Sequence, residues 1–255
     1  MSVLPPAPNF RLDGRRALVT GAGRGIGLAS AAALAQAGAE VTLAARSEGE
    51  LRDACRSIAA EGGRCDYLVL DVTDPRAVDE GVAARGPFQI LVNNAGTNRP
   101  KHLVDVTDED IDAILDLNVK AALYVARVVV KGLLAAGLPG SVINISSQMG
   151  VVGSPRRTVY CASKHAIEGL SKALAWEVGH ANIRVNTICP TFIETAMTAG
   201  MFEDPSFRGW VTDRIALGRL GRMDEVTGAV VFLASDASSL MTGSALMLDG
   251  GWTAA

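Results

Sequence analysis

The sequence predicts a single doubly wound α/β domain, in which helices flank both faces of a parallel sheet. Short apolar runs, about seven of them, alternate with longer stretches of helical periodicity along the 255-residue chain. This alternation builds βαβ units with right-handed crossovers and therefore a parallel sheet. The composition agrees, because 49% of the residues are hydrophobic and only 5% are aromatic. Such a bias towards small and branched aliphatic residues is typical of strands that are buried on both faces.

The apolar runs are the expected strands, and glycine or proline marks most joins between strands and helices. A capping box, Thr107-Asp-Glu-Asp110, precedes the longest helical stretch. The expected strands are 16–20, 41–44, 67–70, 90–93, 141–146, 185–189 and 245–248. The clearest helical stretches are 28–37, 48–60, 111–136 and 162–178.

Residues 12–255 are expected to form this domain, after a loose proline-containing arm at residues 1–11. The segment 190–222 interrupts the rhythm of strands and helices and is expected to be irregular. A long excursion in a compact domain is usually a lid or a binding loop, so we assign this segment to the substrate side.

The bulk properties disfavour several classes of protein. The net charge is −3 without a long charge run, so neither a nucleic-acid nor a membrane partner is expected. No apolar run approaches membrane-spanning length, and the N-terminus lacks the pattern of a secretory signal. The three histidines are scattered, which argues against a metal site. The four cysteines are Cys55, Cys65, Cys161 and Cys189. They lack the spacing of paired metal ligands, so we expect reduced thiols in a cytoplasmic protein.

A glycine-rich loop, Thr20-Gly-Ala-Gly-Arg-Gly-Ile-Gly27, follows the first strand and opens the first helix. Gly21 permits a tight turn, while Gly25 and Gly27 let the backbone approach a pyrophosphate and let the helix pack on the sheet. The helix N-terminus adds N–H groups and a positive dipole. The pattern is G-x-x-x-G-x-G, because Ile26 takes the last glycine position of G-x-G-x-x-G. We expect a dinucleotide site, with a plain turn as the alternative.

The residues after the second strand bear on the choice of cofactor. Ala45 stands about where an acid would bind the ribose hydroxyls of NAD, and Arg46 follows it. Together with Arg24 of the glycine loop, Arg46 suits a 2′-phosphate. NADP(H) is therefore favoured and NAD(H) is possible; alternatively, Arg46 is a solvated arginine at a helix start.

A proton-transfer site is indicated by Tyr160 and Lys164, which share one face of an expected helix. A free tyrosine has a pKa near 10, too high for an efficient base at neutral pH. A nearby ammonium stabilises the phenolate. Ser147 ends the preceding apolar run and completes an ordered set with the glycine loop.

These segments resemble the short-chain dehydrogenase/reductase family, in its single-domain branch, from about Leu12 to Trp252. The resemblance implies a Rossmann-like fold. One departure is Thr191, where the family usually has glycine after proline; a β-branched residue disfavours positive φ, so this turn is expected to differ. Further matching pieces are Asp71-Val72, Asn93-Asn94-Ala95-Gly96, Leu117-Asn118-Val119, Ile145-Ser146-Ser147, Arg184-Val185-Asn186 and Asp249-Gly250-Gly251.

The resemblance also implies roles for single residues. Tyr160 would be the acid/base, Lys164 would stabilise its phenolate and hold the nicotinamide ribose, and Ser147 would orient the substrate oxygen. Asn118 would hold a water in the proton relay. The implied cofactor contacts, besides the glycine loop and Arg46, are Asp71 and Val72 at the adenine, Asn94, Ala95 and Gly96 along the ribose, and Ile193 and Thr195 at the carboxamide.

We therefore expect an NAD(P)(H)-dependent enzyme that interconverts a secondary alcohol and a ketone. The substrate is expected to be a sugar, polyol or hydroxy acid, because Asp204–Val211 resembles the loop of gluconate-type and polyol members of the family. A 3-oxoacyl-thioester reductase is one alternative, and a non-catalytic regulator that senses the cofactor is another. Four arginines are candidates to bind a substrate carboxylate if they do not face water: Arg156, Arg157, Arg208 and Arg214.

The longest helical stretches, 111–136 and 159–178, are apolar on more than one face. One sheet can cover only one face of such helices. We therefore expect a partner subunit to cover the other apolar face. The resemblance implies pairing across a two-fold axis and thus a homo-oligomer, in this case a tetramer.

Overall fold

A seven-stranded parallel sheet with the strand order β3-β2-β1-β4-β5-β6-β7 forms the centre of the computed structural model, which describes residues 7–254. The predicted fold class is thus confirmed, whereas residues 1–6 of the expected arm lie outside the described part. The strands are β1 (Arg16–Thr20), β2 (Glu40–Ala45), β3 (Arg64–Val69), β4 (Ile90–Asn93), β5 (Gly140–Ile145), β6 (Ile183–Pro190) and β7 (Ala245–Leu248).

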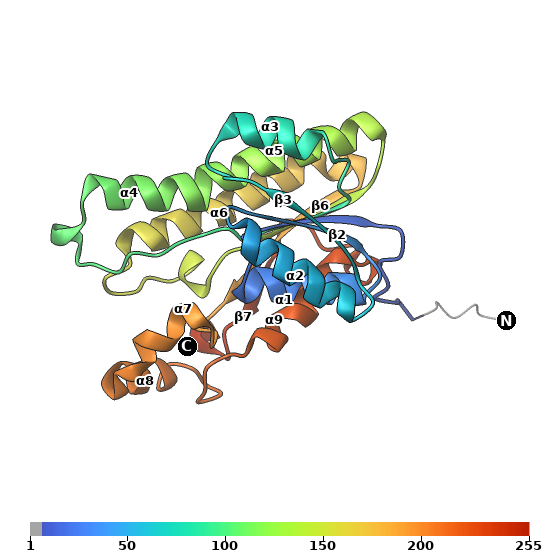
Figure 1. Cartoon of the computed structure of the whole chain (residues 1–255). Helices are drawn as coiled ribbons and strands as arrows, with labels where there is room; N and C mark the ends of the chain where they lie inside the picture. The colour runs from blue at the N-terminus through green and yellow to red at the C-terminus, as the bar shows by residue number, and fades with distance from the viewer. Residues whose placement is uncertain (1–6, 255) are drawn as a thin grey trace.

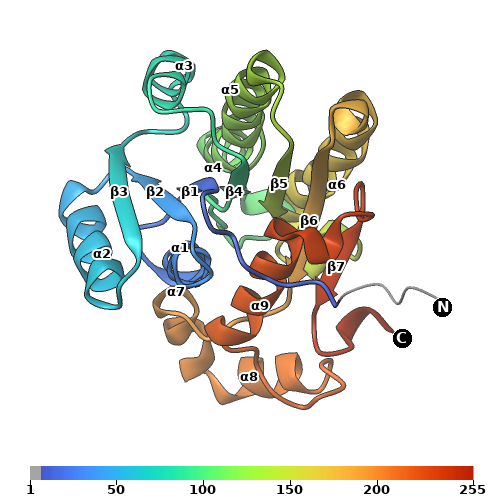
Figure 2. The ribbon, with the colours of Figure 1, turned by 90° about the vertical axis from the view of Figure 1, so that its right-hand side faces the viewer.

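Helices cover both faces of the sheet (Figures 1 and 2). One face carries α3 (Pro75–Ala83), α4 (Asp108–Leu115), α5 (Ala121–Ala136) and α6 (Thr158–Val178). The other carries α1 (Gly25–Gln36), α2 (Glu48–Ala60) and α9 (Met223–Ala234). A separate lobe with α7 (Ala196–Ala199) and α8 (Pro205–Thr212) extends beyond the carboxyl ends of the strands.

Each strand feeds two hydrophobic layers, because successive side chains point to opposite faces of a sheet. In β1, Leu18 packs in the layer with α5, whereas Val19 packs in the layer with α9. In β5, Val142 and Ile143 divide in the same way. Every one of these side chains is fully buried, and each such burial contributes about 1.5–3 kcal/mol. The two layers hold the strand ends, and hence the loops after them, in fixed positions.

The expected helix 111–136 is wrong in detail. It consists of α4 and α5 joined by a π-helical turn, Asp116–Lys120, and it begins at Asp108. The predicted capping box is confirmed, because the Thr107 hydroxyl accepts from the N–H of Asp110 and the Asp110 carboxylate accepts from that of Thr107. A π-helical turn closes its hydrogen bonds over five residues where an α-helix uses four, and such turns are often found at functional sites. Here it contains Asn118.

The segment 190–222 is not irregular as expected. It contains α7 and α8 with a short 3₁₀ turn between them. Aromatic rings supply a small core, in which Phe192 lies 5.8 Å from Phe202 and 5.9 Å from Phe207, both edge-on. Such pairs stabilise beyond the area they bury. These helices are too short to show a clear helical periodicity in the sequence. Their apolar residues pack inside the lobe and not on the sheet.

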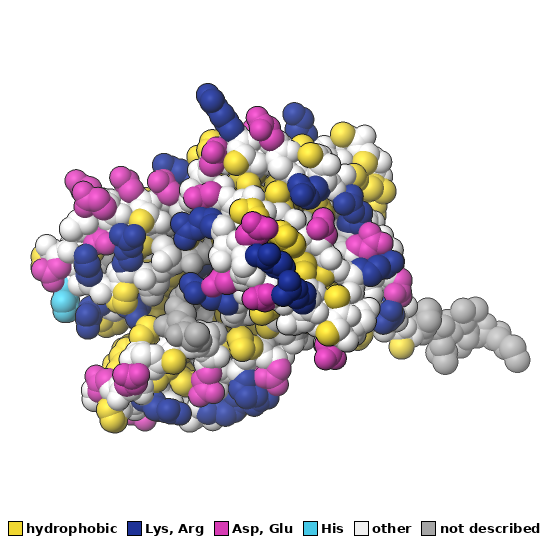
Figure 3. Space-filling model, in the orientation of Figure 1, with side chains coloured by type: hydrophobic (Ala, Val, Ile, Leu, Met, Phe, Trp, Pro, Cys, Tyr) yellow, Lys and Arg dark blue, Asp and Glu magenta, His cyan; other side chains and the backbone are white. Residues whose placement is uncertain are grey.

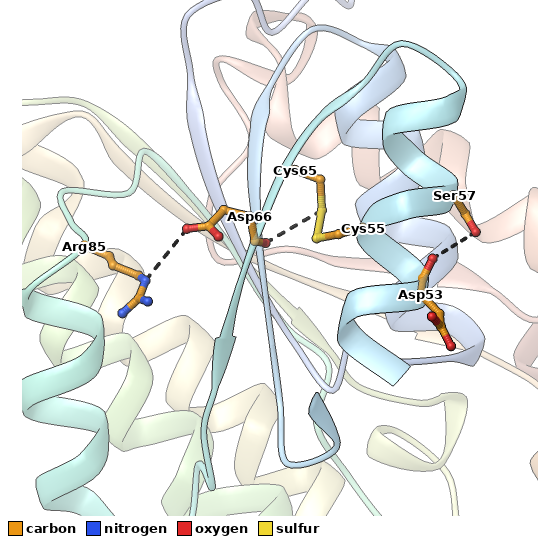
Figure 4. The surroundings of a disulfide bond; sticks show 6 residues. All are labelled: Asp53, Cys55, Ser57, Cys65, Asp66 and Arg85. Atoms are coloured by element: carbon orange, nitrogen blue, oxygen red, sulfur yellow. Dashed lines mark hydrogen bonds and ion pairs between the residues drawn. A yellow bond between two sulfur atoms is a disulfide. The ribbon is translucent and has the colours of Figure 1, made fainter. Parts of the chain in front are cut away.

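The expectation of four reduced cysteines is wrong for one pair. Cys55 of α2 and Cys65 of β3 form a disulfide, with their Cα atoms 5.4 Å apart (Figure 4). The physical reason is that α2 packs directly on β3, a proximity that residue spacing does not reveal. Cys161 and Cys189 are free thiols, and Cys189 is buried.

None of the helices within residues 7–254 has the length and apolar character needed to cross a membrane.

Candidate active site

The strand order reverses between β1 and β4, and loops leaving these two strands therefore diverge and open a crevice at their carboxyl ends. A cleft of about 660 Å³ lies there. Its walls come from the glycine loop, from the ends of β2, β4 and β5, from the start of α6 and from the lobe. Figure 3 shows the surface hollowed between the body and the lobe of α7 and α8. Most of the candidate catalytic, cofactor and substrate residues line this cleft. The exceptions are Gly27, Asn118, Arg156, Arg208 and Arg214.

The glycine loop has the backbone that its glycines permit. Gly21 and Gly25 have φ values of +62° and +58°, a region that side chains disfavour. Gly27 faces a different constraint, because a Cβ there would lie 2.3 Å from the carbonyl oxygen of Gly21. It would also lie 2.5 Å from the side-chain nitrogen of Asn94. Gly27 therefore lets the start of α1 approach the turn, and the amino end of α1 then faces the cleft.

Thr20 is a site residue that the sequence analysis did not single out. Its hydroxyl accepts hydrogen bonds from the N–H groups of Asn94 and Ala95, both at 3.1 Å. The Asn94 side chain in turn donates to the carbonyls of Thr20 and Gly21 at 3.0 and 3.1 Å. The ends of β1 and β4 are thereby tied together. The sequence signal that could have identified Thr20 is its position directly before the first glycine of the loop.

The far end of the cleft, beside β2, carries Arg46, Asp71 and Val72. Burial raises the pKa of Asp71, but hydrogen bonds from Thr73 and the charge of Arg46 outweigh burial and leave that pKa below its usual value. Arg24 reaches the same region and lies 3.5 Å from the carboxylate of Glu50. Glu50 was not anticipated, and it partly neutralises Arg24.

Tyr160 and Lys164 both face the cleft from α6. The Lys164 ammonium donates to the carbonyl of Ile145 at 2.8 Å and lies 5.6 Å from the centre of the Tyr160 ring. Burial lowers the pKa of Lys164 to about 8, against the opposing influence of Cys189 and Glu168. Burial raises the pKa of Tyr160, while Ser147 and the charge of Arg157 act to lower it. The ammonium thus remains mostly charged at pH 7 and lies near the phenol.

Ser147 is buried at the end of β5. Its hydroxyl donates to the Gln148 side chain at 2.9 Å and accepts from the N–H of Met149 at 3.1 Å. The second bond fixes the hydroxyl oxygen beside the cleft.

Asn118 lies in the π turn, behind the cleft wall. Its carbonyl oxygen accepts from the N–H of Thr97 at 2.7 Å, and its amide donates to Thr97 and to Ser163. A Cβ on Gly96 would lie 3.2 Å from the Asn118 side chain and 3.8 Å from the Lys164 nitrogen. The expected water-holding residue is therefore close to Lys164 and holds the loop after β4.

The chain is similar to known proteins over nearly its whole length. A family model described as enoyl-(acyl carrier protein) reductase matches residues 21–253. The D-erythrulose reductase of Gallus gallus is 41% identical over 96% of this chain and 98% of its own length. The chain belongs to the short-chain dehydrogenase/reductase family. Membership of this family makes it an NAD(P)-dependent oxidoreductase, as the sequence predicted.

Two further short-chain dehydrogenases illustrate the likeness. The gluconate 5-dehydrogenase of Gluconobacter oxydans (strain 621H) is 40% identical over 96% of each chain. A solved structure, that of a gluconate 5-dehydrogenase from Burkholderia cenocepacia J2315 in complex with NADP and tartrate, superposes with a TM-score of 0.93. It is 38% identical, with 96% of this chain and 98% of that chain covered.

Thr191, the departure from the short-chain dehydrogenase pattern, does not have the positive φ that would strain it. Its N–H donates to the carbonyl of Leu248 at 3.1 Å, which continues the ladder from β6 to β7. Thr191 thus has a backbone conformation that a β-branched residue tolerates, and the expected difference from the family's turn stays a prediction. Ile193 and Thr195 follow along the cleft wall, and Ile193 bridges to Gly221.

The four candidate arginines have different surroundings. Arg157 is buried and lines the cleft, and Arg156 is exposed. Arg208 is largely exposed and lies 3.9 Å from Glu194. Arg214 stacks on Trp210 at 4.2 Å and donates to that residue's carbonyl. Only Arg157 shares the cleft with Tyr160 and Lys164.

Proposed function

We propose that this chain is an NADP(H)-preferring dehydrogenase of small polyhydroxylated compounds, which interconverts a secondary alcohol and its ketone. The observation that carries the proposal is the convergence of Ser147, Tyr160 and Lys164 on the cleft that also receives the glycine loop. Two relatives support this substrate class, because one is named a D-erythrulose reductase and the other a gluconate 5-dehydrogenase.

The chemistry assigned to these residues is proton transfer. In reduction, the Tyr160 hydroxyl donates its proton to the substrate oxygen, and Ser147 donates a hydrogen bond to the same oxygen in place of Gln148. Lys164 lowers the cost of the resulting phenolate through its positive charge. Asn118 is proposed to hold a water through which Tyr160 is reprotonated. A bound nicotinamide supplies or accepts the hydride at the carbon.

The residues present fit a dinucleotide. Gly21, Gly25 and Gly27 leave space at the amino end of α1, where N–H groups and the helix dipole favour phosphate. Asp71 and Val72 are assigned to the adenine, and Asn94, Ala95 and Gly96 to the ribose side. Ile193 and Thr195 are assigned to the carboxamide. Ala45 leaves no acid at the end of β2, so a 2′-phosphate there meets the Arg46 cation, which also lowers the pKa of the nearby Asp71 carboxyl.

The test is an absorbance assay of nicotinamide turnover against ketoses, polyols and aldonates with both cofactors. We expect wild type to prefer NADP(H), and Arg46→Ala to lose about tenfold to a hundredfold in NADP(H) affinity, as one charge-assisted hydrogen bond implies. Arg52→Ala is the matched control, because Arg52 is exposed on α2 outside the cleft. Equal efficiency with NAD(H) in wild type would refute the preference.

The same assay separates the alternatives. A 3-oxoacyl-thioester reductase, the activity that the name of another relative gives, would turn over acetoacetyl thioesters better than any polyol. A cofactor-sensing regulator would bind NADPH without turnover of any compound in the panel.

The wider assignments remain proposals. We infer one domain at residues 12–255, with 190–222 on the substrate side, and a homotetramer. Leu123 and Leu134 of α5 are each 47% exposed and Trp176 of α6 is 91% exposed, so apolar surface remains on the helices expected to pair. Light scattering should give four times 26.5 kDa; a dimer mass would contradict the tetramer, and a monomer mass would contradict any assembly. A cytoplasmic location is also proposed, although the disulfide removes the cysteine argument for it.

A further inference from the structure

Arg157 is a buried cation without a described counter-charge. The residue is only 7% exposed, and burial lowers the pKa of its guanidinium. Among the groups that the structure describes, none forms an ion pair with this guanidinium or accepts a hydrogen bond from it. An unpaired buried charge is costly to folding, so its replacement by a neutral side chain of similar size is not expected to destabilise the protein. Arg157 therefore has no evident structural role that would offset its cost.

Arg157 stands where two cavities meet. The second cavity, of about 420 Å³, shares Pro100, Arg157, Phe192 and Met201 with the main cleft. Its charged lining residues are Arg156, Arg157 and Asp204.

Asp204 does not neutralise Arg157. Its carboxylate accepts from the N–H and the hydroxyl of Ser206, at 2.9 and 2.7 Å, and so caps α8. Asp204 keeps its negative charge, but the two arginines outnumber it in the lining of the second cavity, so the junction keeps a net positive charge.

The position of Arg157 on α6 adds to this charge. It is the residue directly before the helix, and Tyr160 lies within the first helical turn after it. The amino end of the helix carries a partial positive charge of its own. A small ligand that contacts Tyr160 is thus within one helical turn of both the guanidinium and the helix end.

We propose that Arg157 binds the carboxylate of a hydroxy-acid substrate while the secondary alcohol of that substrate lies at Tyr160. The inference rests on the proposed function, because it names the substrate class of the same site. A guanidinium presents parallel N–H donors that match both oxygens of a carboxylate. One guanidinium balances one carboxylate, which makes an aldonic or related monocarboxylic acid the fitting ligand.

A different role for Arg157 gives a different result. The positive charge also acts on Tyr160, whose pKa it lowers. An arginine that only stabilised the phenolate would change turnover of neutral and acidic substrates by the same factor. An arginine that binds the carboxylate changes the ratio between them.

The experiment compares aldonates of four to six carbons with the alditols of the same carbon chains. Calorimetry on the protein saturated with NADPH measures binding, and nicotinamide absorbance measures kcat/KM. In wild type, we expect at least one aldonate to bind about tenfold to a hundredfold more tightly than its alditol. Arg157→Gln should remove that advantage, and Arg157→Lys should keep only part of it.

Arg208→Gln is the matched control, because this arginine is exposed and lines neither cavity. It should leave the ratio within about twofold of the wild-type value. The melting temperature of the free Arg157→Gln protein should equal or exceed that of wild type, whereas loss of a structural residue would lower it.

The proposal is overturned if no aldonate outbinds its alditol in wild type, or if Arg157→Gln leaves the ratio unchanged. Turnover of neutral ketoses without any preference for acids would leave the proposed function standing and remove this inference alone. Absence of turnover with every compound would remove the proposed function, and calorimetry would still decide whether Arg157 binds the carboxylate.

Discussion

Tyr160→Phe is expected to lower turnover by about 10²–10⁴, the range for a lost general acid or base. The substitution removes only the hydroxyl, because the ring and its packing against the Lys164 ammonium remain. The substitution removes the hydrogen bond between this hydroxyl and Ser147, and such a bond contributes only about 0.5–1.5 kcal/mol, so the melting temperature and NADPH affinity should stay close to those of wild type. Steady-state kinetics and a fluorescence titration with NADPH measure the two effects separately.

A matched control is Tyr124→Phe, since Tyr124 lies on α5 beside Arg127 and outside the cleft. It should retain full turnover. Near-normal rates in Tyr160→Phe would show that another group transfers the proton, and the mechanism proposed for this chain would then be abandoned.

The direction of pH dependence follows from Lys164. With its pKa lowered to about 8, the ammonium loses its proton above that pH in the free protein. Below pH 8 it is charged and stabilises the phenolate; above pH 8 this support declines. A cofactor or substrate that adds charge to the cleft will shift this value, as nearby charges always do.

Much of the fold was predictable because its signals are local. Strands β1 and β4 are apolar runs that end in Thr20 and Asn93, and the sequence predicts both runs, whereas the structure shows that the strand order reverses between them. The Thr107 capping box likewise depends only on residues three apart. Tyr160 and Lys164 share a helical face for the same reason.

Features that depend on contacts between distant segments were not predictable. The Cys55–Cys65 disulfide requires that α2 pack on β3, and the Arg24–Glu50 pair requires that α2 begin beside the glycine loop. Arg157 is buried and lines a cavity together with Phe207 and Trp210 of the lobe, an arrangement of distant segments that also sets it apart from the exposed Arg208. No periodicity in the sequence encodes these distances.

The second large effect is expected for Gly27→Val, which should weaken NADPH binding by up to about a hundredfold. The first added carbon would lie 2.3 Å from the backbone oxygen of Gly21, and backbone cannot move aside as a flexible side chain can. Forcing extra carbons into such a site costs about 1–3 kcal/mol or more, and about 3 kcal/mol corresponds to a hundredfold in affinity. The cost should fall on the turn and on the amino end of α1, where the phosphates are proposed to bind.

Gly27→Ala should give a smaller loss of the same kind, because it adds one carbon in place of three. Gly49→Ala is the control: a Cβ there meets no atom within 4 Å, although the residue lies on α2 near the same end of the cleft. NADPH titrations and thermal melts of the three variants would order them as Gly49→Ala, Gly27→Ala and Gly27→Val, from wild-type affinity to the weakest. If Gly27→Val bound NADPH as wild type does, the start of α1 would not be the phosphate site, and the cofactor would have to occupy the cleft in another orientation.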